Sequence, residues 1–187
     1  MQKSCGWPAN NELMQKYHDT EWGVPLHDDR KLFELLTLDV FQAGLSWQAV
    51  LNKRQNFRKA FDNFIPAKIV RYNKRKITSL LNDSGIIRNR LKIESTINNA
   101  RLVLKIQKEF GSFDAYIWQF VNGNPIRNKW KKLSDIPATS DESDAMSKAL
   151  KKRGFKFVGS TICYAFMQSV GMVNDHLTCC FRYKQCG

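Results

Sequence analysis

Apolar residues recur at helical spacing along nearly the whole chain. In the clearest stretch, which begins near Arg88, four of them follow at intervals of four, three and four: Ile93, Ile97, Ala100 and Leu104. These intervals place the side chains on one face of a helix. Alternation of apolar and polar residues, which is typical of strands, is nearly absent. The pattern predicts an all-α fold, a compact array of about ten short helices.

Residues that begin and end helices support this interpretation. Side chains suited to N-terminal caps stand at Asn10 or Asn11, Asp28, Ser112 and Ser140. Pro66 suits a first helical turn, and Gly154 suits the left-handed position after a last turn. Helical spacing resumes after Gly44 and continues to Phe57. Residues 123–139 are the best candidates for an irregular connection.

The length of 187 residues predicts a single domain, 1–187, in which two helical lobes could flank a cleft. No apolar run approaches the ~20 residues that span a bilayer, and the first residues form no apolar signal segment. Five cysteines, an odd number, argue against a disulfide framework. We therefore expect a cytoplasmic protein with reduced thiols, monomeric and without a membrane partner.

The chain is strongly basic, with 30 lysines and arginines against 17 acidic residues and a formal charge of +13. Such an excess favours a phosphate-rich partner, because neutralised phosphates release their condensed counterions. A generically basic small protein has the same composition, so charge alone does not identify the partner.

Two of the three histidines stand near cysteines, one pair at each end of the chain. Cys5 and His18 lie near the start, and His176 and Cys180 follow one another at a spacing that places both on one face of a helix or tight turn. Four such ligands form a closed tetrahedral zinc site of the structural kind. The alternative is a buried thiol and a core histidine. His27 has no partner at ligand spacing and is expected at the surface.

Residues 151–160 have the pattern of a helix, a glycine-bounded turn and a second helix. Gly154 and Gly159 would let the backbone turn sharply and approach a partner, and the amides of the second helix would face a phosphate. Cationic side chains gather at the same place: Lys151, Lys152, Arg153 and Lys156. An ordinary helical corner with solvated lysines is the alternative. A second basic turn at 85–92 is a further candidate contact.

An acid in apolar surroundings indicates a pocket. Asp39 precedes a glycine break and Trp47, and Tyr17 lies in another stretch rich in aromatic and polar groups. Aromatic faces attract a cationic ring, and a carboxylate adds a specific hydrogen bond, so these residues could receive a base flipped out of DNA. The alternative is core packing, which we favour for Trp22 and Trp118.

Nine stretches of the chain resemble the DNA-3-methyladenine glycosylase I family, a bacterial branch of the helix-hairpin-helix glycosylases. They lie at 5–7, 17–19, 21–25, 42–47, 60–61, 85–88, 147–159, 161–164 and 173–176. The resemblance implies an all-helical fold whose hairpin, from Gly154 to Gly159, binds DNA. It also implies one zinc ion per chain, held by Cys5, His18, His176 and Cys180, and a base pocket formed by Tyr17, Trp47 and the acidic position of Asp39.

The resemblance further implies base-excision repair of alkylated double-stranded DNA. The enzyme would flip out 3-methyladenine, hydrolyse its N-glycosidic bond and leave an abasic site. Because the methylated base is cationic, its bond is already weakened and a strong general acid is unnecessary. No lysine stands out as a Schiff-base nucleophile, so a monofunctional enzyme is expected, with Leu45 as a candidate wedge in the base stack.

The family typically has glutamate where this chain has Asp39, and the shorter side chain must sit deeper or reach the base through water. Asp175 is interpreted as a capping group or as a partner of a zinc ligand, and Cys179 as a bystander to Cys180.

Two other classes of function stay open on sequence alone. One is a zinc-stabilised DNA-binding module that has lost its chemistry through Asp39. The other is a zinc-organised protein-interaction domain whose charge keeps it in solution.

Overall fold

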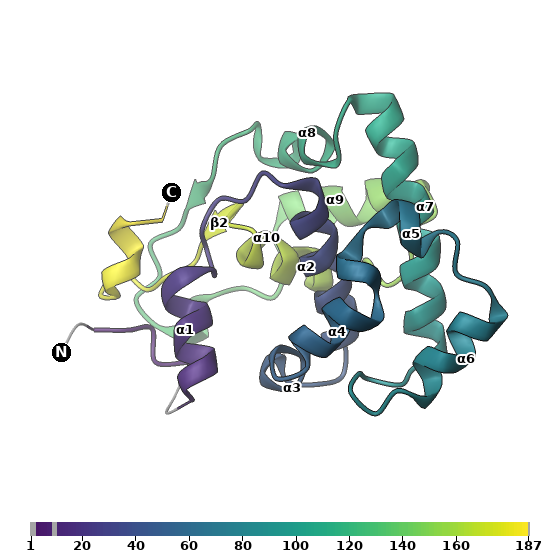
Figure 1. Ribbon diagram of the computed structural model, residues 1–187. Helices are drawn as coiled ribbons and strands as arrows, with labels where there is room; N and C mark the ends of the chain where they lie inside the picture. The colour runs from purple at the N-terminus through teal and green to yellow at the C-terminus, as the bar shows by residue number, and fades with distance from the viewer. Residues whose placement is uncertain (1–2, 9–10, 187) are drawn as a thin grey trace.

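The computed structural model describes residues 3–8 and 11–186, and in this part of the chain ten α-helices and two two-residue strands are present (Figure 1). The helices are α1 (Glu12–Thr20), α2 (Asp29–Gln42), α3 (Trp47–Leu51), α4 (Arg54–Ala60), α5 (Pro66–Ile69), α6 (Lys74–Asn82), α7 (Arg90–Phe110), α8 (Phe113–Trp118), α9 (Asp141–Lys152) and α10 (Ser160–Ser169). The strands β1 (Ile126–Arg127) and β2 (Val173–Asn174) pair in parallel. The prediction of an all-α array is confirmed.

Helix starts follow the predicted caps. The side chains of Asn11, Asp28, Ser112 and Ser140 each accept a hydrogen bond from a backbone amide three residues further on. The alternative cap Asn10 lies outside the described residues. The long helix α7 begins two residues later than expected, because Asn89 caps it.

The helical spacing expected after Gly44 through Phe57 corresponds to two short helices. The chain forms α3 and α4 there, separated by Asn52 and Lys53. The break lets Leu51 pack in a small apolar cluster near the termini while Phe57 packs in the main core. The expected irregular connection at 123–139 contains only β1 and a single 3₁₀ turn, Leu133–Asp135.

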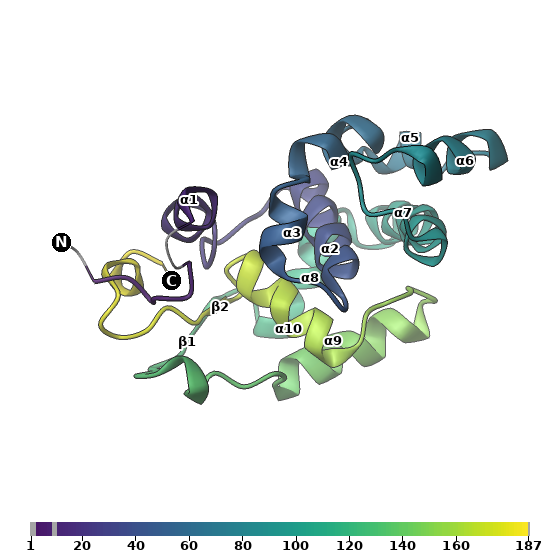
Figure 2. The same ribbon diagram turned by 90° about the horizontal axis from the view of Figure 1, so that it is seen from below.

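The main core surrounds α2. Every residue of α2 from Leu32 to Phe41 is buried, which is typical of a helix enclosed on all sides. Figure 2 shows α2 between α3 and α4 on one side and α9 and α10 on the other. A smaller cluster lies where α1 meets the C-terminal segment, and its buried members are Cys5, Tyr17, Trp22, Leu51, Leu177 and Cys180. Among the described helices, none combines the length and apolar character needed to cross a membrane.

Candidate functional site

A cavity of about 450 Å³ lies at the border between the two apolar clusters. This volume falls within the range of small-ligand pockets. Helices α1, α2, α3 and α10, the N-terminal segment, the turn after α1 and the irregular segment before α9 supply its walls. The lining residues are Trp7, Met14, Tyr17, Trp22, Asp39, Gln42, Trp47, Leu133, Ile136, Pro137, Ala165, Gln168 and Ser169. The three pocket residues predicted from sequence, Tyr17, Asp39 and Trp47, are all among them.

The aromatic walls are more extensive than the sequence interpretation proposed. The rings of Tyr17 and Trp47 lie 5.2 Å apart, and Trp7 packs edge-on against Trp22 at the same distance. Trp22, which was expected only in the core, is 9% exposed and lines the cavity. Trp118 is a core residue as expected. Trp7 was missed, although it belongs to one of the stretches that carry the family resemblance.

Two indole N–H groups in these walls have no acceptor among the described residues. The Nε1 atoms of Trp7 and Trp47 are buried, and no hydrogen-bond partner for either lies within the described residues. Buried polar groups are normally paired. Since both residues line the cavity, a ligand with acceptor atoms can complete these bonds.

Asp39 is the acid of the cavity and is only 1% exposed. Burial raises the pKa of Asp39 well above its usual value, while a hydrogen bond from Ser169 Oγ (3.2 Å) and the charge of Arg54 act in the opposite direction. Burial, followed by the charge of Asp39, also raises the pKa of Tyr17. A cation that enters the cavity stabilises the ionised form of Asp39.

The loop between α2 and α3 borders the cavity. Leu45 lies between Gln42 and Trp47 in the chain and is 46% exposed, a large apolar side chain facing solvent. Gly44 precedes it with φ +80, a left-handed conformation that favours glycine.

Lys92 on α7 holds the start of this loop. Its Nζ donates to the carbonyls of Phe41 (2.9 Å) and Ala43 (2.6 Å), at the C-terminal end of α2, where a positive charge is favourable. Lys92 is only 6% exposed, and burial lowers its pKa. The expectation that it contributes to a basic surface turn is therefore wrong.

Replacing Lys92 with methionine should lower the free energy of unfolding by about 2 kcal/mol, because the buried carbonyl of Phe41 and the partly buried carbonyl of Ala43 lose a charged donor. Denaturant titration of the variant measures this loss. Lys105→Met, on an exposed position of the same helix, should stay within about 0.5 kcal/mol of the unmodified protein. Equal stabilities of the two variants would contradict the role assigned to Lys92.

The predicted hairpin joins α9 to α10. Gly154 adopts φ +94 directly after the end of α9, as a helix-ending glycine does. Gly159 has an ordinary φ of −66 and serves as the N-cap of α10, so it is not a turn-forming glycine as expected. The second left-handed residue of the hairpin is Phe157 (φ +57). No side chain caps α10, which leaves its first amides available to a ligand.

The cationic side chains of the hairpin divide into two groups. Lys151, Lys152 and Lys156 are exposed. Arg153 turns back onto the protein, where it pairs with Glu109 (2.7 Å) and lies over the ring of Tyr116. The three lysines, but not Arg153, are therefore free to meet a phosphate.

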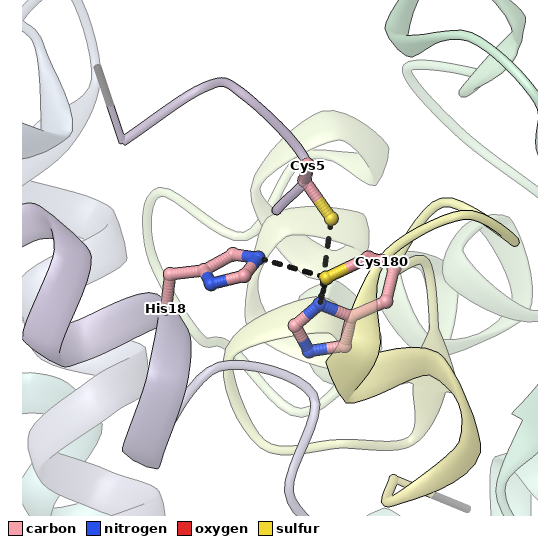
Figure 3. A group of neighbouring side chains, drawn as sticks. Cys5, His18 and Cys180 are labelled. Carbon is pink, nitrogen blue, oxygen red and sulfur yellow. Dashed lines mark hydrogen bonds between the residues drawn. The ribbon is translucent and has the colours of Figure 1, made fainter. Parts of the chain in front are cut away.

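The four residues predicted as metal ligands come together at the termini. Cys5, His18, His176 and Cys180 are all buried, and their ligand atoms lie within 4.8 Å of one another. Figure 3 shows Cys5, His18 and Cys180 converging from the N-terminal segment, α1 and the C-terminal segment. Cys179 is exposed and is not part of the cluster.

The spacing of these atoms fits a tetrahedral metal ion. His176 Nδ1 lies 3.5 Å from Cys5 Sγ and 3.7 Å from Cys180 Sγ, and His18 Nε2 lies 3.6 Å from Cys180 Sγ. Metal–ligand bonds of about 2.0–2.3 Å in a tetrahedron place neighbouring ligands roughly 3.3–3.8 Å apart. These four residues can therefore hold one ion.

Surrounding groups orient the ligands for this purpose. His18 Nδ1 lies 2.7 Å from Asp19 Oδ1, and His176 Nε2 lies 3.0 Å from the carbonyl oxygen of Trp22, so each ring keeps its other nitrogen for the ion. Burial lowers the pKa of His176 to about 4, which keeps the imidazole neutral. Gly23 (φ +75) is needed here, since a Cβ atom would lie 3.1 Å from the His176 ring.

Asp175 has a different role from those expected. Its carboxylate accepts hydrogen bonds from Asn128, Trp130, Tyr164 and Gln168, at 2.7–2.8 Å. These bonds tie residues 128–130 to α10. Within the described residues, no hydrogen bond joins the Asp175 carboxylate to a metal-type ligand, and Asp175 neither lines the cavity nor caps a helix.

The sequence and the fold were compared with those of known proteins. Residues 7–183 match the methyladenine glycosylase family. DNA-3-methyladenine glycosylase 1 of Escherichia coli (strain K12) is 49% identical over 179 residues, 96% of either chain. A crystal structure of 3-methyladenine DNA glycosylase I superposes with a TM-score of 0.93 at 49% identity, over 96% of this chain and 98% of the other.

A structure that describes 3-methyladenine recognition by 3-methyladenine DNA glycosylase I from Staphylococcus aureus gives a TM-score of 0.92 at 35% identity, over 95% of each chain. The sequence match and the shared fold both extend over nearly the whole chain. The protein belongs to the methyladenine glycosylase family.

Proposed function

We propose that this protein is a monofunctional DNA-3-methyladenine glycosylase, which hydrolyses the N-glycosidic bond of 3-methyladenine in alkylated double-stranded DNA and leaves an abasic site. The observation that carries the proposal is the buried Asp39 carboxyl in an aromatic-walled cavity, in a chain of this family. The relatives named above are DNA glycosylases, and one structure concerns recognition of the same base. The single domain, with its cavity between two apolar clusters, suits a base extruded from a duplex.

The residues of the cavity favour a cationic purine over a neutral one. Tyr17 and Trp47 offer aromatic faces to the charged ring, and Asp39 offers the only carboxylate among the described lining residues. When the C1′–N9 bond breaks, its electron pair passes to the base, which becomes neutral. Water adds to C1′ of the sugar and loses a proton.

A covalent mechanism through lysine finds no support here. None of the described residues that line the cavity is a lysine, and Lys92, the buried one near it, is held by two carbonyls. Hydrolysis without strand cleavage is the expected outcome.

The hairpin and the α2–α3 loop are the proposed DNA contacts. Uncapped amides at the start of α10 and the positive end of its dipole favour a phosphate oxygen, and Gly154, Gly159, Lys151, Lys152 and Lys156 surround this position. Leu45, exposed beside the cavity, is the proposed wedge that fills the space left by the extruded base.

The metal we propose is zinc, one ion per chain. Two thiolates and two imidazoles at tetrahedral spacing are typical of a structural zinc site with no position left for water. The ion would tie the N-terminal segment to the C-terminal segment and take no part in the reaction.

The proposed activity is tested by incubating the protein with freshly methylated duplex DNA and measuring the free bases released. We expect 3-methyladenine, intact strands with abasic sites, and strong loss of release in Trp47→Ala. Salt-sensitive DNA binding without base release would support the non-catalytic DNA-binding module. Weak binding that does not depend on salt would support the interaction domain.

Neutralising the hairpin should weaken DNA binding in a salt-dependent way. Lys151→Ala and Lys152→Ala should each reduce the slope of log affinity against log salt by about 0.9, the value for one lost phosphate contact. Binding titrations on unmodified duplex DNA at several salt concentrations measure this. Lys68→Ala on α5 is the control, because α5 lies on the opposite side of α7 from the hairpin (Figure 2). Unchanged slopes in the hairpin variants would exclude this DNA contact.

A further inference from the structure

Ser169 supplies the one hydrogen bond to the Asp39 carboxyl within the described residues. Asp39 lies near the C-terminal end of α2, and Ser169 is the last residue of α10. Ser169 Oγ lies 3.2 Å from Asp39 Oδ2 and 2.9 Å from the carbonyl oxygen of Phe166. Both side chains are buried and both line the cavity.

A serine hydroxyl has one hydrogen, so it can donate to only one of these two oxygens at a time. When Asp39 is protonated, its O–H can donate to Ser169 Oγ while Ser169 donates to Phe166. When Asp39 is ionised, Ser169 must turn its hydrogen toward the carboxylate. The carbonyl of Phe166 is not left unpaired by this change, because the amide of Val170 also donates to it at 3.0 Å.

We propose that Ser169 is a positioning residue for the base-recognition step: it holds the Asp39 carboxyl at the cavity wall in both protonation states and stabilises the carboxylate when a cationic base enters. This inference rests on the proposed function. The proton lost by Asp39 passes to solvent, and the positive charge of the base replaces it. The hydroxyl rotates about a single bond, so no backbone movement is required.

The other groups around Asp39 do not take this role. Arg54 on α4 acts through its charge alone, and it is already paired with Glu34 (2.7 Å) and Glu21 (2.6 Å). Tyr17 on α1 stays a neutral phenol, since burial raises its pKa, and burial likewise raises the pKa of the Cys163 thiol on α10 to about 12. Ser169 is therefore the group whose hydrogen bond changes directly when Asp39 ionises.

The test compares Ser169→Ala with the unmodified protein. Excision of 3-methyladenine from methylated duplex DNA, measured in single turnover with enzyme in excess, should fall about tenfold at pH 7. The loss should shrink as pH rises, because the variant needs a higher pH to ionise Asp39. Titration of the Asp39 carboxyl carbon by NMR, assigned by its absence in Asp39→Asn, should show a higher midpoint in the variant. This second measurement does not depend on activity.

Two further variants separate positioning from a general effect on structure. Ser147→Ala removes a buried serine that donates to Val158 and should leave the Asp39 midpoint unchanged. In an Asp39→Asn background, Ser169→Ala should change excision less than about twofold, because the group through which it acts is gone. An unshifted midpoint, or an equal loss in both backgrounds, would overturn the inference. Absence of base release by the unmodified protein would instead overturn the proposed function.

Discussion

Asparagine in place of Asp39 should lower the single-turnover rate of 3-methyladenine release about 100-fold or more. The substitution keeps the shape of the side chain and removes the one carboxylate that lines the cavity among the described residues. In a buried site such a charge is worth far more than in water, and loss of a preorganised electrostatic group commonly costs 10²–10³ in rate (order of magnitude). Release of free base from methylated duplex DNA, with enzyme in excess, measures the effect.

The matched control is Asp144→Asn, which removes an acid from an exposed position on α9 and should leave the rate unchanged. A rate for Asp39→Asn within a few-fold of that control would show that the carboxylate plays no part in recognition.

The pH dependence of the rate gives a second check. Because burial raises the pKa of Asp39, the rate of the unmodified enzyme should climb with pH above the usual carboxylate range. Asp39→Asn should lose this dependence.

The same substitution should raise stability at neutral pH. The folded protein binds the Asp39 proton more tightly than the unfolded chain does, because burial raises the pKa. The stabilisation by the neutral acid is therefore complete below the unfolded pKa of about 4 and is lost as pH rises toward the folded value. Asparagine stays neutral, so its advantage in melting temperature should be absent in acid and appear above that range.

Local rules were sufficient to predict where four of the described helices begin. Asn11, Asp28, Ser112 and Ser140 cap helices because a short polar side chain before an apolar period satisfies free amides. Gly154 ends α9 for an equally local reason, its left-handed backbone. The break between α3 and α4 depends instead on which cluster each side chain joins, and that is a property of the tertiary structure.

Site residues could be predicted from the sequence only where the residue type and its neighbours in the chain indicate a function. Asp39 is an acid in an apolar stretch, and Cys5 and His176 are metal-type residues. Ser169 and Lys92 carry no such indication, because serine and lysine are ordinary on helices. Their roles arise from partners far away in the chain, 130 residues for Ser169 and Asp39. The cavity wall at 133–137 comes from a segment without helical or strand periodicity, and nothing local places it there.

Adjacency in the chain links the metal cluster to the cavity. Tyr17 lines the cavity and the next residue, His18, belongs to the cluster; likewise Trp7 lines the cavity two residues after Cys5. Trp7 also packs edge-on against His18, with ring centroids 5.3 Å apart. We therefore expect an ion held by this cluster to restrain two aromatic walls of the cavity as well as the termini.

Cys180→Ser should abolish stoichiometric zinc and lower the melting temperature by about 10 °C or more. Structural zinc contributes binding free energy directly to folding, and in a domain of this size each 1 kcal/mol corresponds to roughly 2–4 °C. Thermal unfolding followed by circular dichroism, together with metal analysis of the purified protein, measures both effects.

Zinc affinity should also fall as pH falls, because protons compete for the ligands and burial already raises the pKa of Cys5.

Cys179→Ser is a close control, since it removes the neighbouring thiol, which is exposed and outside the cluster. It should keep one zinc ion per chain and the original melting temperature. If Cys180→Ser retains its zinc, or if both variants melt together, the four residues do not form the metal site. If zinc is lost but base release persists at full rate, the cluster does not hold Trp7 and Tyr17 in place. Because Tyr17 precedes His18 in the chain and Trp7 packs against the His18 ring, we expect loss of the proposed ion to lower release together with the melting temperature.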